Sequence, residues 1–532
     1  GFNITATEVH VGQGTWNPAW TLLVNYSPAL QPVVNVSIGG QWLQLVFDAS
    51  SAYAVVFMKE FATCQPPSLP SCYSYKEAEK HGGFHVCSEN NDPKVICDTR
   101  PNDRWSCTSF LSNVVNTTPH TDVLMIDGLE YRQRGIEGLD TMMMELSGPT
   151  RHIFSWSAVP VRLLTDNLTA VTPGPMNLSL NLFEGVDGIL GGSGPTLSCR
   201  NTTLWHLLLQ RLNATRFFLD FRAPPAALIQ DPGQSQIVFN EVDPAAVGKL
   251  LWSQPKQTGD TINDAMHELL IYRPKVCGVD LLYNASSNWL TVVDTSGPCL
   301  ALPPFLFDRV VTHIPVDCPF GLHEKSFGRL CSPRKVNGER VKLPVFTFSL
   351  QDQSEPSPPE VTLALERLVF RNESGVELVC LARQDTNSER VPADMMYSHI
   401  AFGSMVAAAL YLVIDLENHT IGLASRGDAQ AESSQEYCAV PETCIAMQSF
   451  TWACEQALKS PAASYFPPLN VCEDPPCQRY LFMTLDDDTK MCVWRAPIPM
   501  LFGGLMGVLV VLDLISHRLY KSAIQRASQY AQ

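Results

Sequence analysis

The chain has 532 residues, of which 37 are basic and 53 acidic, so its formal charge at neutral pH is −16. Hydrophobic residues make up 45% of it, which is ample material for a large core and more than one domain. The acidic balance, without any basic stripe, argues against a nucleic-acid-binding protein.

Two sequence features predict the cellular compartment. Seventeen cysteines occur without the paired spacing of a structural zinc site. Eleven Asn-x-Ser/Thr sequons all precede residue 425: Asn3, Asn25, Asn35, Asn116, Asn167, Asn177, Asn201, Asn213, Asn284, Asn372 and Asn418. Together they predict a disulfide-bonded, N-glycosylated protein of the secretory pathway. Because the chain starts at Gly1, we expect that a signal peptide has been removed.

In chain order, short strands rich in β-branched and aromatic residues alternate with Gly, Pro and Asn, which predicts an all-β architecture. The first marked feature is an apolar run that ends at Asp48 and opens into a small-residue turn, Ala49-Ser50-Ser51. Five cysteines then fall between residues 60 and 128, in a stretch that we interpret as a disulfide-stiffened insertion.

Three further features follow along the chain. The run of residues 203–212 predicts a helix, although it is too continuously apolar for a clean amphipathic stripe. Proline and glycine make residues 223–233 a linker by composition. A second apolar run ends at Asp294 and opens into Thr295-Ser296-Gly297.

Acid–base catalysis by a pair of carboxyl groups requires two buried strands that each end with an aspartate in a turn. Two carboxylates at contact distance share a proton, because like charges that close cannot both ionise. One group then acts as an acid and the other as a base toward a bound water. Asp48 and Asp294 are therefore the candidate catalytic pair.

Several segments, in order, make the first 425 residues or so resemble the pepsin-like aspartic proteases. Besides the two aspartate turns, they are 33–40 (VVNVSIGG), the flap-like 131–141, 186–191 (VDGILG), 402–404 (FGS), 411–415 (YLVID) and 421–424 (IGLA). The resemblance implies a bilobal all-β fold with a peptide-binding cleft, in which Tyr131 stands at the flap tyrosine.

The chain departs from that family's pattern at its active-site turns. The family writes Asp-Thr/Ser-Gly twice, whereas here Ser50 and Ser296 stand at the glycine positions and Ala49 replaces one threonine. We expect these side chains to loosen the positioning of the carboxylates, where about 1 Å of misplacement can cost roughly a hundredfold in rate. The interpretation is a pseudoprotease whose aspartates persist as a hydrogen-bonded pair, with an active acid endopeptidase as the alternative.

The C-terminal region predicts membrane attachment. Six cysteines between residues 438 and 492 favour a small disulfide-stapled module over a spacer stalk. Residues 496–515 are apolar and about long enough to cross a bilayer, and basic residues follow them. This predicts a single-pass span rather than a buried helix. Gly503, Gly507 and Asp513 within it are candidates for packing against another membrane helix, or are ordinary helix composition.

The predicted organisation is a lobe at 1–228 with its insertion at about 60–128, a second lobe at 234–427, a juxtamembrane module at 428–495, a transmembrane helix at 496–515 and a cytoplasmic tail at 516–532. The expected function is protein–protein interaction by a non-catalytic ectodomain at the cell surface or in endolysosomes. The expected partners are the lipid bilayer and a protein in the membrane or the extracellular space, with no metal or cofactor. A third possibility is a structural subunit of a membrane complex.

Overall fold

The computed structural model describes most of the chain up to residue 426 and parts of the remainder. The described residues are 20–59, 72–89, 105–109, 120–126, 129–148, 151–164, 169–170, 183–194, 202–243, 246, 249–255, 267–282, 288–317, 331–351, 359–383, 399–426, 464–466, 471–473, 483–485, 492–494 and 497–530. The chain divides into two compact units, Gly1–Cys444 and Ile445–Gln532.

An eleven-stranded sheet, here called the first sheet, forms one half of the first unit. Its order is β2 (Asn25–Tyr26), β3 (Pro32–Ile38), β4 (Gln41–Asp48), β12 (Gly188–Gly191), β5 (Ala54–Phe57), β10 (His152–Leu164), β9 (Leu129–Leu146), β6 (His85–Glu89) and β7 (Trp105–Ser109), with β8 (His120–Ile126) and β11 (Thr169–Ala170) paired to β9. Strand β4 alternates at its start and is fully buried over its last four residues. That change carries the strand from the surface into the core, where it ends at Asp48.

An eight-stranded sheet, here called the second sheet, forms the other half. Its order is β25 (Glu360–Ala364), β24 (Val345–Ser349), β16 (Glu268–Val276), β18 (Asn288–Val293), β29 (Ile400–Phe402), β19 (Leu300–Leu302) and β28 (Leu381–Arg383), with β17 (Val279–Asp280) paired to β16. Like β4, strand β18 begins with alternating burial and ends fully buried. Asp294 follows it directly.

The two sheets repeat one local pattern around their aspartates. Strand β12 runs parallel to β4 and antiparallel to β5. Likewise, β29 runs parallel to β18 and antiparallel to β19. The backbones approach so closely at these crossings that only glycine fits. A Cβ at Gly191 would lie 2.4 Å from a backbone carbon of Ala52, and one at Gly403 would lie 2.2 Å from the Cys299 carbonyl oxygen. The repeated crossing places both aspartate turns in equivalent surroundings.

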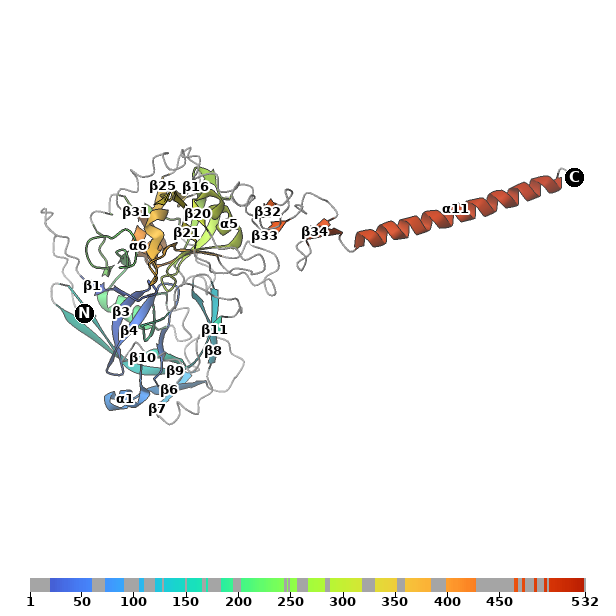
Figure 1. Ribbon diagram of the computed structural model, residues 1–532. Helices are drawn as coiled ribbons and strands as arrows, with labels where there is room; N and C mark the ends of the chain where they lie inside the picture. Colours follow the sequence, from blue (N-terminus) through green and yellow to red (C-terminus); the bar gives the residue numbers. More distant parts are fainter. Residues whose placement is uncertain are drawn as a thin grey trace. The chain divides into compact units, whose positions relative to one another are not determined.

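A six-stranded sheet, here called the shared sheet, draws strands from both halves of the unit. Its order is β1 (Trp20–Leu23), β14 (Gln236–Phe239), β13 (Arg216–Asp220), β30 (Leu410–Asp415), β31 (Thr420–Ser425) and β15 (Leu251–Trp252). In Figure 1 the blue and cyan strands such as β3, β9 and β10 gather together, apart from a yellow-green to orange group with β16, β25 and β31. The predicted linker at 223–233 lies between β13 and β14, which pair with each other.

Few helices accompany the sheets in the described residues of this unit: α1 (Tyr75–Ala78), η1 (Glu79–His81), α3 (Leu204–Leu212), α5 (Pro304–His313), η4 (Leu365–Leu368) and α6 (Ser404–Ala409). Small hairpins pair β20 (Val316–Asp317) with β21 (Ser332–Pro333), β22 (Lys335–Val336) with β23 (Glu339–Arg340), and β26 (Val369–Arg371) with β27 (Glu377–Val379). The helix predicted at 203–212 is confirmed as α3. Its N-cap Thr203 accepts a hydrogen bond from the backbone N–H of His206 at 3.1 Å. The predicted all-β class is confirmed.

The described residues of the second unit form two short hairpins and one long helix. The hairpins pair β32 (Ser464–Phe466) with β33 (Val471–Glu473) and β34 (Met483–Leu485) with β35 (Cys492–Trp494). Helix α11 (Pro497–Tyr530) has 34 residues. Among the described residues, no helix is long and apolar enough to cross a membrane, which does not support the span predicted at 496–515. The described side chains of α11 begin at Met506, so those of 496–505 lie outside this result.

Some predicted features fall outside the described residues. These are the sequon asparagines Asn3, Asn116, Asn167, Asn177, Asn201 and Asn284, much of the insertion at about 60–128, and most of the module at 428–495. Gly503 lies in α11 before the first described side chain. Gly507 and Asp513 lie in the exposed part of that helix.

Candidate functional site

Asp48, the first predicted site residue, is the last residue of β4 and is completely buried. Its Oδ1 accepts hydrogen bonds from the Ser50 backbone N–H at 2.8 Å and from the Ser50 hydroxyl at 2.7 Å. Its Oδ2 is also buried and accepts no hydrogen bond from any described residue. One oxygen of this carboxyl group is therefore held by its own turn.

Asp294, the second predicted site residue, follows β18 and is 3% exposed. Its Oδ1 accepts a hydrogen bond from the Ser296 hydroxyl at 2.7 Å and a longer one from the Gly297 backbone N–H at 3.4 Å. The two turns thus use the same device. The serine two positions after each aspartate folds back and donates to it.

The structure brings the two aspartates together through Ser50. Its Oγ lies 2.7 Å from Asp48 Oδ1 and 3.5 Å from Asp294 Oδ1. Because a hydroxyl group carries one proton, it donates to one carboxyl oxygen and accepts from the other only when that other group is protonated. The Ser50 hydroxyl is therefore within hydrogen-bonding distance of both carboxyl groups, and it donates its one proton to Asp48 Oδ1, the nearer oxygen.

Burial acts on the same proton. The pKa of Asp48 is raised above its ordinary value, chiefly because burial penalises the charged carboxylate. The hydrogen bonds from Ser50 oppose this shift, because they stabilise the charged form. Desolvation outweighs them, so Asp48 is protonated more readily than an exposed aspartate.

The serines fit their turns without backbone strain, because neither Ser50 nor Ser296 has a positive φ. Each turn is closed by its own hydrogen bonds. The serines change how much space is filled beside each carboxyl group. A hydroxyl group now fills space that a glycine leaves open beside the carboxyl group.

Thr295 connects the two turns directly. Its Oγ1 accepts a hydrogen bond from the Ala49 backbone N–H at 3.0 Å and donates one to the Phe47 carbonyl at 2.7 Å. All three residues are buried, so both contacts are shielded from water. The methyl group of Ala49 offers no bond in return.

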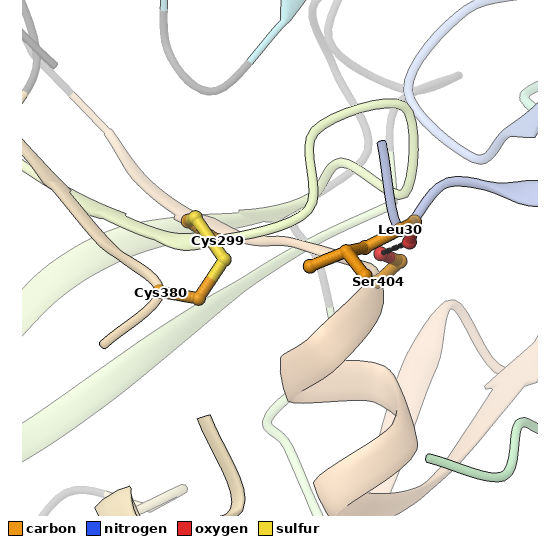
Figure 2. Close-up of a disulfide and its surroundings, with 4 residues drawn as sticks. All are labelled: Leu30, Cys299, Cys380 and Ser404. Atoms are coloured by element: carbon orange, nitrogen blue, oxygen red, sulfur yellow. Dashed lines mark hydrogen bonds between the residues drawn. A yellow bond between two sulfur atoms is a disulfide. The ribbon is translucent and has the colours of Figure 1, made fainter. Parts of the chain in front are cut away.

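Three residues that the sequence did not single out as site residues also connect the two halves. Gln31 Nε2 donates to the Ser296 carbonyl at 2.5 Å. His267 Nε2 lies 3.0 Å from the Gly192 carbonyl, which only accepts, so this nitrogen carries the proton. Ser404 Oγ donates to the Leu30 carbonyl at 2.7 Å (Figure 2). Of the three, only Ser404 lies in a segment that the sequence singled out, residues 402–404.

A disulfide lies directly after the second turn in the sequence. Cys299, two residues past Gly297, is bonded to Cys380 (Figure 2). The Cys299 carbonyl accepts the Gly403 N–H at 3.0 Å, so the bridge and the strand crossing meet at one residue. Cys72 and Cys331 are also disulfide-bonded.

Residues 131–141, which were predicted to be flap-like, lie within the single strand β9 and do not form a hairpin by themselves. The hairpin next to them joins β8 to the start of β9, and its last pair is Ile126 with Leu129. Tyr131 lies on β9 opposite Leu124 and Ala170. Its side chain lies outside the described part of the molecule.

The described sequon asparagines lie at the surface. Asn25, Asn35, Asn213 and Asn418 are exposed, and Asn372 is half-buried. Asn35 is the one exposed residue of β3. Within the described ranges, no group of three or more His, Cys, Asp or Glu side chains is placed to hold a metal ion.

Comparison with known proteins adds no relative. No family model matches the chain, and no curated protein matches it either. The site is therefore interpreted from its own geometry.

Proposed function

We propose that residues 1–427 are a pepsin-like pseudoprotease, a bilobal protein that keeps the architecture of an aspartic protease and works by binding rather than by cleavage. The repeated strand crossing supports the fold, because it delivers one buried aspartate from each sheet. Asp48 and Asp294 are the remnant of the dyad in this proposal, and Tyr131 lies on the flap hairpin.

The observation that carries the proposal is the position of the Ser50 hydroxyl. Catalysis by two carboxylates requires an attacking water that both of them hold and activate. Here the Ser50 Oγ is within hydrogen-bonding distance of both Oδ1 atoms, at 2.7 and 3.5 Å, as a bridging water would be. A water in that place would have to displace a side chain fixed to the backbone, so the chain itself blocks the nucleophile.

A second candidate function, acid endopeptidase, has an observation in its favour. Asp48 keeps a buried Oδ2 with no hydrogen-bond donor among the described residues, and burial raises its pKa. A water bound at that oxygen, on the side away from Ser50, would restore a nucleophile. This candidate requires cleavage at acidic pH.

The setting is part of the proposal. Exposed sequons and disulfides support a glycoprotein of the secretory pathway, on the cell surface or in endolysosomes. The apolar residues 496–515 are the proposed membrane attachment, with the lipid bilayer and a membrane or extracellular protein as partners. Extraction of membranes with alkaline carbonate tests it, because a peripheral protein is released and an inserted one stays with the lipid.

The decisive experiment measures cleavage of a peptide library by the purified full chain between about pH 3 and 6, the range in which a shared-proton dyad acts. We expect no difference between the wild type and Asp48→Asn. Ser50→Gly should gain binding of pepstatin, because it removes the hydroxyl group that is within hydrogen-bonding distance of both carboxyl groups. Ser296→Gly is the matched control and should gain less, since the Ser296 hydroxyl is hydrogen-bonded to its own aspartate. Wild-type cleavage that is lost in both Asp48→Asn and Asp294→Asn would establish the endopeptidase instead.

A further inference from the structure

A pocket of about 360 Å³ lies away from the aspartate pair. One wall is the loop Pro28–Leu30 with Glu184, which belong to the half that contains the first sheet. The opposite wall is 370–374, the end of β26 and the turn after it, and Ala226 also lines the pocket. Its volume falls within the range of about 300 to 1,000 Å³ that is typical of small-ligand sites.

The turn at 372–374 is itself a glycosylation sequon, Asn372-Glu373-Ser374. All three of its residues line the pocket. Asn372 Oδ1 accepts the backbone N–H of Val376 at 2.9 Å, which fixes the orientation of the side-chain amide. Glycans are attached through Nδ2, so the observed hydrogen bond leaves the reactive nitrogen available. The attachment point and the pocket therefore coincide.

We propose that this pocket is the binding site for the first N-acetylglucosamine of a glycan on Asn372, which would fill it and join its two walls. The proposal rests on the secretory route proposed above, because only a chain that takes this route acquires the sugar. The sugar would be covalently attached to a residue that lines the pocket. Its effective concentration at the pocket would therefore be high, and no free ligand would be needed.

The lining matches the chemistry of an amino sugar. Pro28, which is exposed, and Ala226, which is half-buried, offer apolar surface that suits the C–H faces and the acetyl methyl group. Glu184 and Glu373 supply carboxylate acceptors for sugar hydroxyls. The pocket thus offers both kinds of contact that such a ring requires.

Filling the pocket would affect the contact between the two halves. Leu30 accepts the hydrogen bond from Ser404, and the adjacent Gln31 donates to Ser296. A sugar packed against this loop would restrict the same segment that these two hydrogen bonds hold. The glycan would therefore stabilise the same junction that carries the aspartate pair.

The test uses the full chain expressed in glycosylating cells, with glycopeptide mass spectrometry to measure occupancy. Native protein is treated with peptide-N-glycosidase before and after denaturation. We expect the glycan on exposed Asn35 to be released from native protein, and the glycan on Asn372 to be released only after denaturation. In parallel, Asn372→Gln and Ser374→Ala should each lower the melting temperature by about 1 °C, the shift expected when a unit of this size, Gly1–Cys444, loses one modest stabilising contact.

Two matched variants control for the substitutions themselves. Ser374→Thr keeps the sequon and Asn35→Gln removes a different glycan, so both should melt like the wild type. An unglycosylated Asn372 beside an occupied Asn35 overturns this inference and leaves the secretory route intact. No glycan at any site overturns both. If the Asn372 variants fail to fold, equal release of both glycans from native wild-type protein still refutes the proposal.

Discussion

The two aspartate turns differ most in how they contact each other. The second turn reaches across through Thr295, which bonds the Ala49 N–H and the Phe47 carbonyl of the first. Ala49, at the equivalent position of the first turn, cannot reciprocate, because it has no hydroxyl group. The contacts in the other direction are the long one from Ser50 to Asp294, at 3.5 Å, and a hydrogen bond from Gln31, outside the turn, to the Ser296 carbonyl. The interface is therefore asymmetric, with a buried threonine of the turn on one side and a residue of a neighbouring loop on the other.

Removing the Thr295 hydroxyl should have the largest effect on this asymmetric junction. Thr295→Val keeps the shape but leaves a buried N–H and a buried carbonyl unpaired, which should reduce the free energy of unfolding by about 2 to 4 kcal/mol. Urea unfolding of the purified protein measures this loss. Thr295→Ser, which keeps the hydroxyl group, should lose about 1 kcal/mol or less. Equal losses in the two variants would contradict a dominant role for the two hydrogen bonds.

A buried carboxyl group extends the comparison to pH. Asp140, on β9 of the first sheet, is 2% exposed. It accepts hydrogen bonds from the Tyr73 hydroxyl and the Thr141 N–H, both at 2.7 Å. Burial raises its pKa to about 6, against the smaller opposing effect of the Tyr73 hydrogen bond. The native state therefore holds this proton more tightly than the unfolded chain does.

The sign of the pH effect follows from that difference. The stabilisation by bound proton is complete below about pH 4, declines as the unfolded chain ionises and is lost above about pH 6, a change of roughly 3 kcal/mol. Asp140→Asn should remove this component, so its loss of stability from pH 4 to pH 7 should be smaller than that of the wild type. Hydrogen exchange at both pH values should locate the change in the first sheet and not in the second.

Tyr73→Phe supplies the control for this effect. It removes a hydrogen bond that lowers the pKa of Asp140, so the decline should shift to higher pH instead of disappearing. Identical pH profiles for the wild type and both variants would show that Asp140 is not the group responsible.

The smallest expected effect concerns Ser404. Ser404→Ala removes one hydrogen bond, to the Leu30 carbonyl, and should cost about 1 kcal/mol. Ser349→Ala is a matched control, because Ser349 is equally buried but its Oγ has no partner among the described residues. That change should be neutral or slightly stabilising, as measured by the midpoint of urea unfolding. If Ser404→Ala is no less stable to urea than the control, Gln31, His267 and Thr295 remain as the contacts that hold the two halves together.

The sequence predicted the elements that have local signals. Apolar runs that end at Asp48 and Asp294 indicated buried strands, and Thr203 marked the start of α3. It did not predict that serine at the glycine positions would be accommodated, because that depends on backbone angles set by the neighbouring strands. Gln31 and His267 were missed for a similar reason. Their partners lie 265 and 75 residues away along the sequence, and no local pattern predicts such contacts.

The shared sheet has a consequence for biosynthesis. Strand β13 ends at Asp220, yet one of its neighbours, β30, begins at Leu410, and β31 ends at Ser425. A ribosome must therefore add about two hundred residues, at roughly 5 to 20 residues per second, before the edge of β13 is covered. During those seconds the nascent chain presents an unpaired apolar strand, the kind of edge that invites aggregation. Premature termination before residue 410 would make that exposure permanent and leave a product that requires chaperones.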